Sequence, residues 1–183
     1  MKRFFIGFIL ITCLSLNSTS QKVMIKGKEG ERLLAWNDFN GTADANARHA
    51  ALTAWTVHYS YTGVDLESTR VSFKELEVTL QLDNDRSWVK EGKGTVYLLK
   101  HEQGHFDIGR LCQLEILANV KSTNFDKAGF RSQMKSIFKN AMEKYKSLGS
   151  KYDEETNHSI NKEKQEEWNA FLLKEKERLL KLN

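Results

Sequence analysis

The sequence predicts an α+β fold, in which a small antiparallel or mixed sheet packs on a central helix and two further helices follow. Two observations carry this prediction. Segments 54–61 and 76–82 have the period of strands, and helical patterns come only after them, at about 95–120, 130–148 and 161–182. Strands followed by helices are typical of the α+β class. With 183 residues, the chain is long enough for one packed domain and too short for two.

The first twenty residues have the pattern of a secretory signal peptide. Basic residues 2–3 precede an apolar run, 4–16, which ends in the small polar stretch 17–20. A membrane-spanning helix needs about 20 apolar residues, so this run is too short to be an anchor. We therefore expect cleavage before Gln21, export to the periplasm or the medium, and a single mature domain of residues 21–183 with no stable membrane insertion.

The cysteines and the charge narrow the class of protein further. A lipid tether at Cys13 is the alternative to simple export, although Thr12 is a poor fit to the small residue that usually precedes a lipidated cysteine. Without the signal, Cys112 is the only cysteine, so no intramolecular disulfide can form. Loss of Lys2 and Arg3 lowers the formal charge from +4 to +2, and nothing in this balance predicts a nucleic-acid partner.

The strands are recognised by alternation. In segment 54–61 Trp55, Val57, Tyr59 and Tyr61 share one side, and in segment 76–82 every second residue is leucine or valine. Each strand is therefore expected to be half-buried, with one face on the core. The polar, Gly- and Lys-rich segment 21–30 before them is expected to be a flexible lead-in.

The helices differ in character. Segment 95–120 has apolar residues around most of the helix circumference, which predicts a central rather than a peripheral helix. Segment 130–148 repeats apolar residues at three- and four-residue spacing, and Gly149 offers a stop. After a polar loop at 151–158, Asn161 is expected to cap the last helix, whose charged face is solvated.

The central helix carries the sequence His101-Glu102-Gln103-Gly104-His105. Residues four apart on a helix are about 40° apart around the axis and about 6 Å apart along it, so both imidazoles can reach one ion. Imidazole nitrogens are preferred ligands of Zn²⁺, and a hydrolytic zinc site keeps one position open for water. Glu102 is placed to accept a proton from that water, as in metalloproteases with two ligands and a general base on one helix. The alternative is that these residues have a purely structural role and bind no metal. That alternative must explain why two imidazoles and a carboxylate lie on an apolar helix, since burying a polar group without a hydrogen-bond partner costs about 2 kcal/mol or more.

Such a site needs a third protein ligand, and the sequence excludes several residues. The metzincin pattern would have a histidine at position 111, which is Leu111. Glu115 lies ten residues past His105, about 15 Å along the same helix, and is too far away. Asp107 is expected to point to the opposite side of the helix.

The remaining candidates for the third ligand are His49, His58, His158 and Asp153. His49 lies in an Ala-rich stretch and His58 on the polar side of a predicted strand, where histidines are most often ordinary surface or core residues. His158 lies in the predicted loop between two helices, which has little reason to be ordered unless something holds it. We therefore predict His158 as the third ligand, with one zinc ion per chain.

Five short patterns extend along the chain: Trp-x-Asp-Phe, Ala-x-Thr, His-Glu-x-Gly-His-Phe, Tyr-Asp-x-x-Thr-x-His and Gln-x-x-Trp. They are formed by Trp36, Asp38, Phe39, Ala51, Thr53, His101, Glu102, Gly104, His105, Phe106, Tyr152, Asp153, Thr156, His158, Gln165 and Trp168. Over most of the mature chain they resemble a bacterial family described as predicted secreted zinc-dependent proteases. The resemblance implies His158 as third ligand and makes Tyr152 or Asp153 a partner in or beside the site. Ser159 stands where the family commonly has glycine, which loosens any argument from the geometry of this loop.

These observations predict an exported zinc metallopeptidase with a zincin-like fold. Zn²⁺ is expected on His101, His105 and His158, with Glu102 as general base. Tyr152 is a candidate hydrogen-bond donor to the carbonyl oxygen under attack, and packing of its ring under the loop is the alternative. The expected partner is a peptide or protein substrate that lies along an exposed strand edge.

Two other functions fit the same sequence. A hydrolase that acts on a non-peptide amide, such as one in the cell wall, would use identical residues. A non-enzymatic periplasmic protein would bind partners through its C-terminal amphipathic helix, with or without a structural metal. An inert structural zinc site is usually closed by four protein ligands, whereas the sequence offers three good ones. The substrate and the oligomeric state are not predicted.

Overall fold

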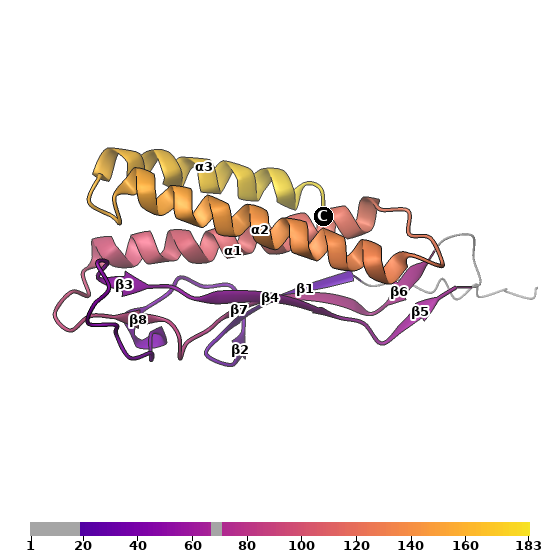
Figure 1. The fold of residues 1–183 in the computed structure, drawn as a ribbon, viewed down its shortest axis with the longest axis horizontal. Coiled ribbons are helices and arrows are strands. Elements are labelled where there is room, and N and C mark those ends of the chain that lie inside the picture. The colour runs from indigo at the N-terminus through magenta and orange to yellow at the C-terminus, as the bar shows by residue number, and fades with distance from the viewer. Residues whose placement is uncertain (1–18, 67–70) are drawn as a thin grey trace, which may run out of the picture.

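A computed structural model describes residues 19–66 and 71–183 of the chain, and Figure 1 shows their arrangement. A mixed sheet leads the chain and three helices follow, which confirms the α+β prediction. The predicted signal peptide, with Cys13, falls mainly on residues 1–18, which lie outside the described residues. Its last two positions, Thr19 and Ser20, are the first two residues of strand β1.

The main sheet has four strands in the order β2-β1-β7-β4. In that order they span Lys28–Glu29, Thr19–Ile25, Leu76–Leu82 and Trp55–Ser60. β1 runs parallel to β7, with Val23 opposite Leu80, and β4 runs antiparallel to β7, with Val57 opposite the same leucine. The alternation predicted for β4 and β7 is confirmed, because their apolar residues face the core and Thr56, His58 and Ser60 are exposed.

Three long helices cover this sheet. They are α1 (Val96–Ser122), α2 (Phe130–Thr156) and α3 (Lys162–Leu180). α1 lies against the sheet on one side and against α2 and α3 on the other, so it is central, as its apolar girth predicts (Figure 1). Side-chain oxygens of Thr95 and Asn161 cap α1 and α3. In the part of the chain that the structure describes, no helix is both long enough and apolar enough to cross a membrane.

Smaller elements complete the fold. β3 (Ala51–Leu52) pairs antiparallel with β8 (Trp88–Val89). β5 (Gly63–Asp65) pairs antiparallel with β6 (Ser72–Lys74). A short 3-10 helix, η1, spans Trp36–Asp38. The pairs β3-β8 and β5-β6 lie toward opposite ends of the molecule in Figure 1. The β3-β8 pair is near the N-terminal end of α1.

The core lies where α1 meets the sheet. Buried side chains here include Ile108, Leu111, Cys112 and Ile116 of α1 and Val23, Val57, Val78 and Leu80 of the strands. A Cβ at Gly109 would lie 2.7 Å from the Trp55 ring and 2.9 Å from Leu80, closer than van der Waals contact allows. Glycine at this position therefore lets α1 approach the sheet and fixes the height of the helix above it.

The prediction of a flexible lead-in at 21–30 is wrong. The segment contains most of β1 and all of β2, and Val23 and Ile25 are buried. Its strand partner, β7, lies far along the chain, so the local pattern carries little sign of the pairing.

The prediction of a loop at 151–158 after a stop at Gly149 is also wrong. α2 continues through Gly149 to Thr156, and the left-handed residue that ends it is Asn157, with a φ of 47°. Tyr152 and Asp153 therefore project from a helix that packs on α1.

Candidate metal centre

Three elements meet at the end of the molecule drawn at the left of Figure 1: the N-terminal half of α1, the end of α2 and the segment around β3. His101, Glu102 and His105 come from α1, and Asp153 comes from α2. Because α1 lies between the sheet and the other helices, the polar residues on its inward faces are removed from water. His101 and Glu102 are each only 2% exposed.

The side chains of His101, His105 and Asp153 converge. The Nε2 atoms of His101 and His105 lie 3.2 Å and 3.0 Å from Oδ1 of Asp153. One ligand atom from each of the three residues lies within 4.8 Å of the others. The histidines are one helical turn apart, so their rings point to the same side, and Asp153 meets them from the facing helix. This group could hold a metal ion.

A buried glutamine orients the ring of His101. Nδ1 of His101 lies 2.9 Å from Oε1 of Gln165, which is fully buried. An amide oxygen only accepts, so this contact places a ring proton on Nδ1, and Nε2 is the ring atom that faces Asp153. Outer partners of this kind hold metal-binding histidines in place and raise their basicity.

The charges in the cluster support one another. Burial acts to raise the pKa of Asp153, but hydrogen bonds and charge from His101 and His105 outweigh it and hold that pKa well below its usual range. Burial acts to lower the pKa of His105, whereas Asp153 and Glu102 raise it, and the net shift is upward. Asp153 is therefore kept as a carboxylate that attracts positive charge.

Glu102 lies next to this cluster and is held by Thr53. The Thr53 hydroxyl donates a 2.7 Å hydrogen bond to Oε2 of Glu102. Both residues line the same cavity as His101 and His105. Among the described residues, the other carboxylate oxygen of Glu102 has no hydrogen-bond partner. Thr53 thus fixes the direction of the carboxylate and leaves one oxygen available.

Tyr152 lies behind the histidines and does not line the cavity. Its ring stacks on His101 with centroids 4.6 Å apart, and its hydroxyl donates to the His101 carbonyl oxygen at 3.1 Å and accepts from Gln165. A Cβ at Gly104 would overlap this hydroxyl, so glycine is what admits the ring. The expected role in polarising a substrate oxygen does not fit this placement, because the hydroxyl is fully buried and already bonded.

The other histidines have different surroundings. Nδ1 of His158 lies 3.3 Å from Oδ1 of Asp153, and its side chain is 46% exposed. His49 lines the cavity and stacks on His158. His58 is exposed on β4 and does not line the cavity. The residue predicted as third ligand, His158, thus lies beside the cluster, while Asp153 completes the converging group.

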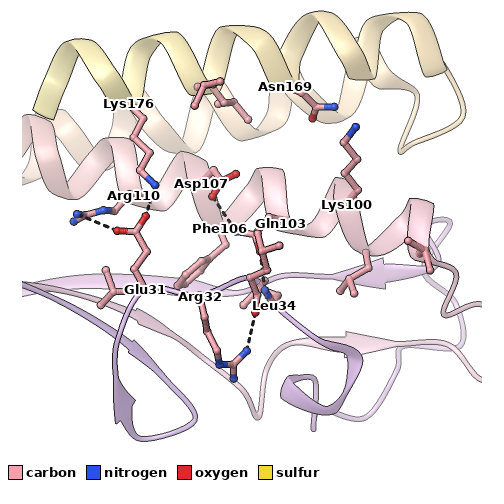
Figure 2. Close-up of a pocket in the computed structure, with 16 residues that line it drawn as sticks. Glu31, Arg32, Leu34, Lys100, Gln103, Phe106, Asp107, Arg110, Asn169 and Lys176 are labelled. Atoms are coloured by element: carbon pink, nitrogen blue, oxygen red, sulfur yellow. Dashed lines mark hydrogen bonds and ion pairs between the residues drawn. The ribbon is translucent and has the colours of Figure 1, made fainter.

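The cavity at the cluster is small, about 60 Å³, and a much larger groove of about 860 Å³ lies on the opposite face of α1. Figure 2 shows this groove between α1, α3 and segment 31–34. There Lys176 and Arg110 both approach the Glu31 carboxylate. Asp107 faces this groove, which agrees with the direction expected from its position on the helix.

Sequence reasoning gave no role to two residues that support the site. Thr53 and Gln165 bond to side chains 49 and 64 residues away along the chain, so no local pattern connects them to their partners. Their only signal was membership of the Ala-x-Thr and Gln-x-x-Trp patterns.

Comparison with known proteins adds a family and no activity. The family described as "Bacterial protein of unknown function (DUF922)" matches residues 20–159, a span that contains the converging side chains and Glu102. No curated protein and no solved structure matches the chain. The resemblance to secreted zinc-dependent proteases therefore stays a prediction.

Proposed function

The chain belongs to the bacterial DUF922 family, and from its site we propose that it is an exported metal-dependent hydrolase, specifically a zinc peptidase. The observation that carries the proposal is the convergence of His101, His105 and Asp153 beside Glu102. Export is proposed from the basic start and short apolar run within residues 1–20.

The donor set fits zinc. Ligand atoms about 2.0–2.1 Å from a tetrahedral ion lie about 3.3 Å apart, and the two imidazole nitrogens lie 3.2 Å and 3.0 Å from the Asp153 oxygen. With the Nδ1 proton held by Gln165, His101 can give the lone pair of Nε2 to a bound cation, and the same cation would satisfy the Asp153 carboxylate. Three protein ligands also leave a position open, as in hydrolytic sites. When bound, the ion supplies a Lewis acid that lowers the pKa of a neighbouring water toward neutrality.

Glu102 is the general base in this proposal. Thr53 holds one of its oxygens, and the other accepts a proton from the water as the water oxygen attacks the carbonyl carbon. Glu102 then gives this proton to the leaving nitrogen as the C–N bond breaks. The products are a carboxylic acid and an amine, and the carboxylate of Glu102 is restored.

The strand edge beside the cavity supports a peptide as the substrate. Within the described residues, β3 pairs with β8 alone, and residues 50–53 line the cavity. An unpaired edge can bind an extended peptide as an added strand through main-chain hydrogen bonds. A cavity of about 60 Å³ has room for water but not for a large side chain, so the peptide would lie across its opening.

Glu102→Gln tests the proposal. Glutamine keeps the size and helix preference of the residue but cannot accept a proton near neutral pH. We expect zinc content by elemental analysis and helix content by circular dichroism to be retained, while hydrolysis of an unstructured protein falls by about 10²-fold or more. Asp107→Asn, on the opposite face of α1, is the matched control and should keep full activity. Undiminished hydrolysis by zinc-loaded Glu102→Gln would exclude this mechanism.

A further inference from the structure

His49 lies in the site without belonging to the converging ligands. It precedes β3 and lines the same small cavity as Glu102, His101 and His105. A cavity of about 60 Å³ is only a few ångströms across, so anything bound in it lies close to all of these residues. In the mechanism above, His49 neither holds the metal nor moves the proton.

Two aromatic rings stack on the imidazole of His49. Trp88 stacks on it with centroids 5.1 Å apart and planes 20° apart, and His158 stacks on it at 5.8 Å and 25°. Within the described part of the chain, Trp88 and His158 make no ring contact with each other, so each contacts His49 separately. Rings that stack on the face of an imidazole leave its edge uncovered, and the edge carries both nitrogen atoms. Among the described residues, neither nitrogen of His49 has a hydrogen bond or an ion pair, so this edge is free to bind a substrate.

The turn after α2 holds the outer ring of this stack. Asn157, His158 and Ser159 have φ values of 47°, 49° and 75°, in the left-handed region that residues with side chains seldom adopt. Such conformations persist where surrounding contacts require them, and they gather at functional sites. His158 also contacts Asp153, so its ring touches both the metal cluster and His49.

We propose that His49 is a catalytic hydrogen-bond donor to the carbonyl oxygen of the substrate. A neutral imidazole has one N–H in either tautomer, so no change of protonation is needed. As the water oxygen bonds to the carbonyl carbon, the π electron pair of the C=O bond moves onto the carbonyl oxygen. The N–H of His49 stabilises this negative charge without giving up its proton, while the proton of the water goes to Glu102 and then to the leaving nitrogen. This inference rests on the proposed function and gives His49 the role that the sequence suggested for Tyr152.

The test uses His49→Phe, which keeps a flat ring that can stack on Trp88 and His158 but has no N–H. In the zinc-loaded chain we expect kcat to fall by about 10²-fold or more with KM little changed, since the donor acts mainly in the transition state. Zinc affinity, measured by competition with a chelator, should be unchanged. The affinity for a phosphonamidate peptide, whose tetrahedral phosphoryl group resembles the reacting carbon, should fall by a similar factor.

Two further variants make this result specific. His49→Gln restores an N–H donor and should recover part of the turnover and of the phosphonamidate affinity. His58→Phe, on the exposed face of β4, is the matched control and should change none of the three quantities.

Several outcomes would overturn the inference. Native turnover and native phosphonamidate affinity in His49→Phe would make His49 a packing residue, and a parallel loss of zinc affinity would make it a ligand. Glu102→Gln, measured alongside, separates the two proposals. If it loses turnover while His49→Phe keeps it, only the inference fails. Turnover that survives both changes, or a native chain that neither hydrolyses peptides nor binds the phosphonamidate, rejects the proposed function and the inference with it.

Discussion

The two faces of α1 differ in how their polar groups are satisfied. On the groove face, Lys176 and Arg110 meet Glu31, and Arg32 meets Asp38. These charges are balanced locally, in a hollow of about 860 Å³ (Figure 2). On the other face, ligand atoms converge on one another beside a cavity of about 60 Å³, and none of the described residues that line it is a lysine or an arginine. In the proposed function, convergent donors that could hold a cation, rather than the size of a hollow, locate the chemistry.

The largest effect expected from this contrast is on metal binding. Asp153→Asn removes the carboxylate from the convergent group, and zinc affinity should fall by about 10²-fold or more, because even the loss of an outer partner costs about 10- to 100-fold. Chelator competition measures the change, with Glu154→Gln, at the exposed neighbouring position, as the control. Equal zinc affinity in the two variants would return the third ligand to His158 and remove the contrast between the faces.

A second prediction concerns the close packing behind the histidines. A Cβ at Gly104 would overlap Tyr152, so Gly104→Ala should lower the free energy of unfolding by about 1–3 kcal/mol. A Cβ at Gly149 would meet only His105 Nδ1, at an ordinary 3.9 Å. Gly149→Ala should therefore raise the free energy of unfolding by about 0.5–1 kcal/mol, since glycine is costly inside a helix. Urea denaturation of both variants measures this; destabilisation of similar size at both positions would contradict the special role of Gly104.

A third prediction concerns the groove side, where stability depends on pH. Hydrogen bonds from Arg32, opposed by burial, hold the pKa of Asp38 below its ordinary value of about 3.9. Because the folded pKa is depressed, this stabilisation is present above the unfolded pKa and is lost as pH falls through the folded value. Asp38→Asn should cost about 1 kcal/mol near neutral pH and progressively less below about pH 4. Urea denaturation across this range tests the sign, and a difference that grew on acidification would refute it.

The smallest effects are expected at the rim of the groove. Val96 is 87% exposed and Leu173 is 60% exposed. Val96→Ser and Leu173→Ser should change the free energy of unfolding by no more than about 0.5 kcal/mol and leave zinc affinity and hydrolysis unchanged. Loss of turnover in either variant would show that the groove takes part in binding substrate.

Local periodicity was enough for most of the fold. The strands β4 and β7 follow from alternation, and the central place of α1 follows from its apolar girth. β1 was missed because its sequence is mostly polar and becomes a strand by pairing with β7, which is a contact between distant segments. The end of α2 was missed because Gly149 offers the usual stop, while the left-handed conformation falls on Asn157 instead.

The candidate site, like the fold, was predictable where local spacing decides it and not where tertiary packing does. The spacing of His101 and His105 on a helix is enough to bring them to one point, and Asp153 was among the candidates for the third ligand. The choice of His158 depended on treating 151–158 as a loop. Once residues 151–156 are helical, Asp153 faces α1 and His158 lies just beyond the helix end. Tertiary packing between α1 and α2 decides this, and no single segment encodes it.

Anomalous diffraction at the zinc edge, from crystals of the zinc-loaded chain, tests the central claim most directly. We predict one peak per chain, about 2.0–2.2 Å from Nε2 of His101, Nε2 of His105 and a carboxylate oxygen of Asp153, with Glu102 nearby but not bound to the ion. A peak held by His158 without Asp153, or no zinc on the two histidines, would contradict the account.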